Sequence, residues 1–115
     1  MADASEEELL RELLEYSDER VIVEGVKDER ALKSLGFSDV TRLNGGCSIL
    51  SVVESLQGSR VSVLTDLDQE GKILRKKLLE LFNMYGMQEI KRPREILAQL
   101  RISHVEGLQN LGKGD

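Results

Sequence analysis

Three acidic residues at the ends of two apolar runs have the clearest potential for chemistry in this sequence. The run that begins at Arg20 ends in Glu24, and the run 61–65 is followed by Asp66-Leu-Asp68. Both runs have the β-branched composition of buried strands. Ligands of open α/β sheets bind beyond the carboxyl ends of parallel strands, and neighbouring strands lie about 4.8 Å apart. If these two strands are neighbours, the three carboxylates converge. A hard divalent cation such as Mg²⁺ would remove their repulsion.

A purely structural explanation of the two aspartates remains open. An aspartate at a strand-to-helix turn often only caps the helix, and Asp66 or Asp68 could do no more than that. Glu24 has no comparable capping role, so it favours a metal site made of all three acids. The stretch 66–71 also resembles the start of an EF-hand loop. The twelfth position is Lys77 rather than a bidentate glutamate, so an EF-hand is not expected.

The spacing of apolar residues predicts an α/β fold with a mainly parallel sheet of about four strands and helices on both faces. Strands are expected at 20–24, 40–43, 61–65 and 87–90, with a short edge strand at 102–105. Helices are expected at 6–16, around 31–35, around 49–56, at 69–84 and at 95–100. A tail at 109–115 is expected to be frayed.

Length and composition limit the function classes. A chain of 115 residues fits a single domain at 1–115. Its net charge of −5 and 3% aromatic content argue against a broad electrostatic grip on phosphates and against base stacking. No apolar run reaches the roughly 20 residues that span a bilayer, so we expect a cytoplasmic protein without membrane association. Cys47 is the single cysteine and is expected to be a packed thiol.

The motifs together resemble the Toprim domain, which primases, topoisomerases and some ribonucleases share. The matching residues are Val-Ile-Val-Glu-Gly at 21–25, Asp28, and Asp66-x-Asp68-x-x-Gly71, and the resemblance covers about residues 19–108. The sequence is most similar in look to small stand-alone archaeal Toprim proteins and to the N-terminal domain of the 5S ribosomal RNA maturase. The resemblance implies a Toprim (Rossmann-like) fold, Glu24 as general acid/base or metal ligand, and Asp66 and Asp68 as ligands of Mg²⁺, with Mn²⁺ as a substitute.

The resemblance also implies a function on nucleic acid, either RNA or DNA. The chain would be a Mg²⁺-dependent phosphodiesterase, nuclease-like, RNA-processing or primase-related. The alternative is a non-catalytic module that binds RNA, a ribosomal particle or a nuclease or primase partner. A receiver-like phosphorylation switch, which also holds Mg²⁺ at the ends of two strands, is a third reading on fold analogy alone.

Weaker candidates surround the acids. Residues near the helix starts could bind phosphate or substrate through backbone N–H groups and positive charge, although ordinary turns and solvated helix ends explain them equally well: Lys27, Asp28, Asn44, Gly45, Gly46, Gly71 and Lys72. Two basic runs, 72–76 and 91–94, could contact nucleic acid or could be solvated faces. His104 is either structural or peripheral to the site.

Overall fold

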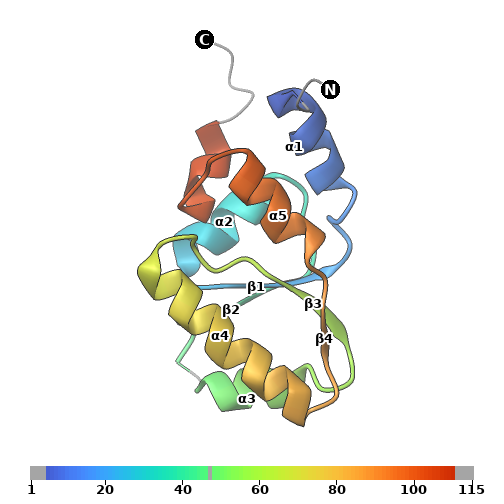
Figure 1. Ribbon diagram of the computed structural model, residues 1–115, viewed down its shortest axis with the longest axis vertical. Coiled ribbons are helices and arrows are strands. Elements are labelled where there is room, and N and C mark those ends of the chain that lie inside the picture. Colours follow the sequence, from blue (N-terminus) through green and yellow to red (C-terminus); the bar gives the residue numbers. More distant parts are fainter. Residues whose placement is uncertain (1–4, 47, 111–115) are drawn as a thin grey trace.

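The computed structural model describes residues 5–46 and 48–110, which form a parallel sheet between two layers of helices (Figure 1). The strands are β1 (Arg20–Val23), β2 (Val40–Arg42), β3 (Arg60–Val63) and β4 (Gln88–Glu89). They are ordered β2-β1-β3-β4, and every pair is parallel. The predicted fold class is therefore confirmed. Because β1 and β3 are neighbours, their carboxyl ends share one edge of the sheet.

The two faces of β1 lie in different hydrophobic cores, because successive side chains of a strand point to opposite faces. Val21 and Val23 pack with Leu32 of α2 (Val26–Ser34) and Ile96 of α5 (Arg92–Gln99). The same core takes residues from α1 (Glu6–Leu14) and from the 3-10 helix η1 (Val105–Asn110). This layer covers one face of the sheet.

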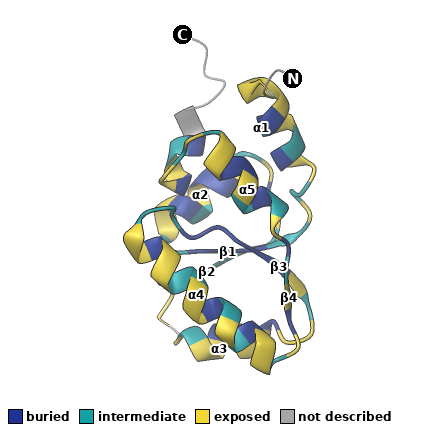
Figure 2. Ribbon diagram, in the orientation of Figure 1, coloured by how far each residue is buried: buried dark blue, intermediate teal, exposed yellow. Residues whose placement is uncertain are grey.

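The other face of the sheet is covered by α3 (Ile49–Ser55) and α4 (Gln69–Met84). Ile22 of β1 packs there with Val53 of α3 and with Leu78 and Phe82 of α4. Figure 2 shows the result: the central strands β1 and β3 are mostly buried, and the helices on either side have exposed outer faces. No helix in the described ranges is long and apolar enough to cross a membrane.

Local signals define the helix starts. Ser5 and Ser48 accept hydrogen bonds from backbone N–H groups three residues further on, and Asp68 does the same for Gly71 at 2.8 Å. Such caps satisfy N–H groups that have no partner inside the helix. Pro93 lies in the first turn of α5, where the missing N–H costs nothing, so this helix begins at Arg92, earlier than predicted.

The edge strand predicted at 102–105 is wrong. Residues 102–104 are irregular and Val105 begins η1. The apolar residues of this part of the chain have a different role: Val105 and Leu108 of η1 are buried in the core with Leu32 of α2. The backbone here bonds to a loop instead of a strand: Leu67 donates to the Ser103 carbonyl at 2.7 Å. η1 extends to Asn110, while 111–115 and the thiol of Cys47 lie outside the described residues.

Candidate metal centre

The ends of β1 and β3 are joined by a hydrogen bond between two of the predicted site residues. Glu24 follows β1 and Asp66 lies in the β3–α4 loop, and the Asp66 backbone N–H donates to Glu24 Oε1 at 2.8 Å. The bond holds the glutamate side chain beside the loop that carries both aspartates. Glu24 and Asp66 are therefore brought together from positions 42 residues apart in the chain.

The Asp66 and Asp68 carboxylates meet the imidazole of His104. Asp66 Oδ1 accepts a hydrogen bond from the Val105 backbone N–H at 2.9 Å, and Asp66 Oδ2 lies 3.2 Å from His104 Nδ1. Asp68 Oδ2 lies 3.9 Å from the same nitrogen. Ligand atoms of the three residues lie within 4.8 Å of one another, a spacing that could hold a metal ion. We call Asp66, Asp68 and His104 the acidic cluster.

Asp68 combines the two roles that the sequence left open. Its Oδ1 caps α4 through the Gly71 N–H, and its Oδ2 faces His104. The cap fixes the orientation of the carboxylate, so helix capping and membership of the acidic cluster are compatible.

Burial, hydrogen bonds and neighbouring charges shift the pKa values around the cluster. Burial raises the pKa of Glu24, and the nearby carboxylates of Asp66, Asp68 and Asp28 add to the rise. Burial also raises the pKa of Asp28, whose carboxylate accepts a hydrogen bond from the Gly25 N–H. The hydrogen bond to Asp66 raises the pKa of His104. A protonated imidazole and a bound cation would each offset the same excess of negative charge.

Gly71 is packed against the loop that it follows. A Cβ built on Gly71 would lie 1.9 Å from the Asp66 carbonyl oxygen, closer than real Cβ atoms come. The Gly71 carbonyl also accepts a hydrogen bond from the buried Thr65 hydroxyl at 2.7 Å. The glycine of the Asp-x-Asp-x-x-Gly motif thus allows α4 to start directly against Asp66.

A hollow of about 330 Å³ adjoins the acidic cluster and gathers several of the weaker candidates. Its lining includes the predicted residues Glu24, Lys27, Asp28, Asn44 and Asp66, and also Glu106. Gly45, Gly46 and Lys72 are not part of this lining. Gly46 has a φ of 91°, which explains a glycine in that turn.

His104 and Glu106 were not in the predicted set of site residues. Both come from the segment after α5, which returns the chain to the carboxyl ends of β1 and β3. No spacing rule links them to Glu24 or Asp66. The sequence indicates His104 only as structural or peripheral to the site and indicates no role for Glu106.

Many of the basic residues proposed to contact nucleic acid instead have partners in the chain. Arg75 makes two hydrogen bonds to Glu89 at 2.8 and 2.7 Å, and Arg92 makes two to Glu12 at 2.6 and 2.7 Å. Arg94 donates to backbone carbonyls. In the described part of the chain, the members of the two runs without an ion pair to a carboxylate are Lys72, Lys76, Lys91 and Arg94.

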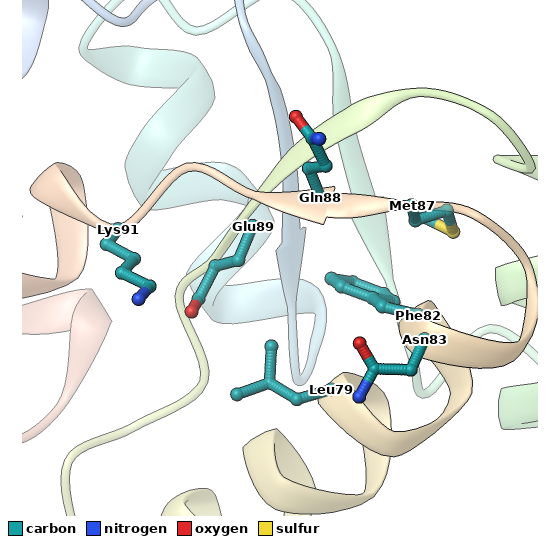
Figure 3. A pocket seen from close by; sticks show the side chains of 7 residues that line it. All are labelled: Leu79, Phe82, Asn83, Met87, Gln88, Glu89 and Lys91. Atoms are coloured by element: carbon teal, nitrogen blue, oxygen red, sulfur yellow. The ribbon is translucent and has the colours of Figure 1, made fainter.

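A second hollow, of about 340 Å³, lies between α4 and β4 (Figure 3). Glu89 and Lys91 point to the side of β4 on which Leu79 of α4 lies, and Gln88 points to the other side. Glu89 is already paired with Arg75. This hollow does not contain residues of the acidic cluster, which makes the strand ends the better candidate for chemistry.

Comparisons with known proteins agree with the geometry. Residues 19–102 match the family described as Toprim domain. A UPF0292 protein of Methanosarcina barkeri is 38% identical over 109 residues, covering 89% of this chain and 76% of the relative. One from Thermococcus onnurineus is 33% identical, covering 91% and 79%. A solved structure of an Aquifex aeolicus protein has a TM-score of 0.78 and 30% identity, covering 90% of this chain and 98% of that one. The predicted likeness to small archaeal Toprim proteins is confirmed.

Proposed function

Because this chain belongs to the Toprim domain family, we propose that it acts with Mg²⁺ on phosphodiester bonds of nucleic acids, in a nuclease-like or RNA-processing reaction. The observation that carries the proposal is the acidic cluster at the carboxyl ends of two adjacent parallel strands, with Glu24 beside it. Ligand sites of open α/β sheets have this location.

The residues fit a divalent cation. Asp66 and Asp68 supply carboxylate oxygens, and burial, together with the carboxylates of Asp66, Asp68 and Asp28, raises the pKa of Glu24 beside them. Mg²⁺, or Mn²⁺ in its place, would be held by these aspartates and would stabilise negative charge that develops on a phosphate. Glu24 is suited to moving a proton, because its raised pKa lies closer to neutral pH than that of an ordinary glutamate. Glu24 Oε1 is fixed by the Asp66 N–H, which leaves Oε2 for that proton.

A non-catalytic docking module is the second candidate, and the pairing of the arginines favours it. Arg75 and Arg92 are engaged with Glu89 and Glu12, and the net charge is −5. These two arginines are therefore less available to hold a polyanion. A partner protein or a ribosomal particle would then supply the grip on RNA.

The decisive experiment compares the wild type with Asp66→Asn/Asp68→Asn. Asparagine keeps an oxygen that can accept from the Val105 and Gly71 N–H groups, so the fold should be retained. Each protein is titrated with Mg²⁺ and Mn²⁺ by calorimetry and incubated with labelled structured RNA and with single- and double-stranded DNA. Metal-dependent cleavage that disappears in the variant supports the enzyme.

Control variants distinguish the effect of losing two negative charges anywhere on the protein from the effect of losing them in the acidic cluster. Asp18→Asn/Glu80→Gln makes the same charge change at positions outside the acidic cluster and should leave metal binding and cleavage unchanged. Glu24→Gln should abolish cleavage while retaining metal binding. Nucleic-acid or partner binding without cleavage would favour the docking module. Metal binding that survives the double substitution would refute the assigned ligands.

A further inference from the structure

Arg94 reaches from α5 to the backbone behind the acidic cluster. Its Nη1 donates to the carbonyl oxygens of Val63 at 3.1 Å and Thr65 at 2.7 Å, and to Thr65 Oγ1 at 3.1 Å. Its Nη2 donates to the Asp66 carbonyl oxygen at 3.1 Å. One guanidinium therefore contacts three residues in the segment that leads from β3 to the cluster.

This segment needs such a partner because it leaves the sheet before α4 begins. β3 ends at Val63 and α4 starts at Gln69. Buried carbonyls outside a ladder must find other donors, and Thr65 is fully buried. The planar guanidinium presents donors in a fixed fork, so it can hold several acceptors in one relative arrangement.

The position of Arg94 costs desolvation free energy, because its guanidinium is partly removed from water. Burial lowers the pKa of Arg94, and the positive charge of Arg75 lowers it further, while Glu89, Glu24 and Asp66 act in the opposite direction. A guanidinium remains charged at neutral pH, so a buried one needs compensating partners. Here the backbone carbonyls and the nearby acids provide them. An arginine whose only role was to bind nucleic acid would instead extend into solvent.

We propose that Arg94 is a positioning residue for the metal centre: its bonds to the Thr65 and Asp66 carbonyls fix the loop that aims the Asp66 and Asp68 carboxylates. The inference rests on the proposed metal site. Lysine cannot replace the arginine, because a single ammonium cannot reproduce the fork that spans these acceptors.

The first test compares Arg94→Lys with Arg92→Lys from the same helix. Arg92 is paired with Glu12 of α1, away from the cluster, so its replacement should lower the melting temperature without changing metal affinity. Arg94→Lys should weaken Mn²⁺ binding about 10- to 100-fold, the effect typical of removing a residue that orients metal ligands. Affinity is measured by electron paramagnetic resonance of free Mn²⁺, and stability by metal-free thermal denaturation. If the wild type binds Mn²⁺, an equal affinity in Arg94→Lys would overturn the proposal.

Two further measurements keep the test decisive. If Arg94→Lys does not fold, Arg94→Gln, which keeps amide donors without the charge, is used instead with the same expectation. In Arg94→Ala, millimolar methylguanidinium should restore Mn²⁺ affinity, and no restoration would count against a positioning role.

Failure of the metal site and failure of the Arg94 proposal are distinguishable. The Asp66 and Leu67 amides donate to Glu24 and to the Ser103 carbonyl, so their hydrogen exchange reports the loop without metal. Faster exchange in Arg94→Lys than in Arg92→Lys supports positioning even if the wild type binds no Mn²⁺. Unchanged exchange refutes it.

Discussion

Replacing Gly71 with alanine would insert a methyl group into the contact between α4 and the β3–α4 loop. At most exposed helix positions this substitution stabilises a protein by roughly 0.5–1 kcal/mol, because glycine loses more backbone freedom on folding. At Gly71 the added Cβ would lie 1.9 Å from the Asp66 carbonyl oxygen, 2.6 Å from its carbonyl carbon and 2.8 Å from its nitrogen. All three are backbone atoms, so no side-chain rotation relieves the overlap.

The size of the effect follows from these distances. Ordinary contact begins at 3.4 Å, so the carbonyl oxygen and the helix start must separate by about 1.5 Å, which is 3.4 minus 1.9. A shift of that size would break the bond from Arg94 to Asp66, now 3.1 Å, and strain the Asp68 cap, now 2.8 Å. Overpacking of this kind costs about 1–3 kcal/mol, which outweighs the backbone gain. We expect a melting temperature lower by about 5–15 °C.

Gly107→Ala is the matched control for this substitution. A Cβ at Gly107 would lie 3.6 Å from Ile102 Cγ2, an ordinary contact, so its melting temperature should change little. Both variants are compared by metal-free thermal denaturation and then titrated with Mn²⁺. Gly71→Ala should also weaken Mn²⁺ binding, because Asp66 must move. A Gly71→Ala protein as stable as the wild type would refute the close approach of helix and loop.

Three other substitutions test separate contacts, each by chemical or thermal denaturation. Ser62→Ala should stabilise the protein by about 0.5–1 kcal/mol, because the buried Ser62 hydroxyl has no partner in the described residues; a loss of stability would show a hidden one. Thr65→Val should cost about 1–3 kcal/mol, because the Gly71 carbonyl loses the hydroxyl donor and Arg94 Nη1 loses the hydroxyl acceptor; Thr65→Ser, which keeps the hydroxyl, should cost less. The Arg92 hydrogen bond holds the pKa of Glu12 below its ordinary value of 4.5, so this pair stabilises the fold above about pH 4.5 and the contribution is lost as pH falls through the lower folded-state pKa. Glu12→Gln should therefore remove part of the acid-induced loss of stability, and identical pH profiles would contradict the pairing.

The sequence was sufficient for the fold and for the position of the acids because both depend on local pattern. Short runs rich in valine and isoleucine indicated the strands, and their parallel direction follows from the helices between them. Glu24 and Asp66 could then be placed at one edge of the sheet. Whether they bind a metal is a property that pattern alone does not decide.

Contacts made by side chains across long sequence separations could not be predicted. His104 lies 38 residues from Asp66, and no periodicity links the two. The same limit explains the basic runs, since Arg92 finds Glu12 at a separation of 80 residues. Residues 102–105 were predicted as a strand with apolar ends, Ile102 and Val105, whereas these side chains pack on the core from an irregular segment and from the 3-10 helix η1.

The hydrogen bond from the Val105 N–H to Asp66 determines when, during synthesis of the chain, the acidic cluster can form. Residues 103–108 supply the Ser103 carbonyl for Leu67, the Val105 N–H for Asp66, and two buried side chains of the core. A nascent chain that has emerged from the ribosome only as far as α5 contains Glu24, Asp66 and Asp68 but lacks His104 and the Val105 N–H that bind the Asp66 carboxylate. The acidic cluster therefore forms only after residues 103–108 have been synthesised, so a chain truncated after α5 would carry the motif without the assembled site.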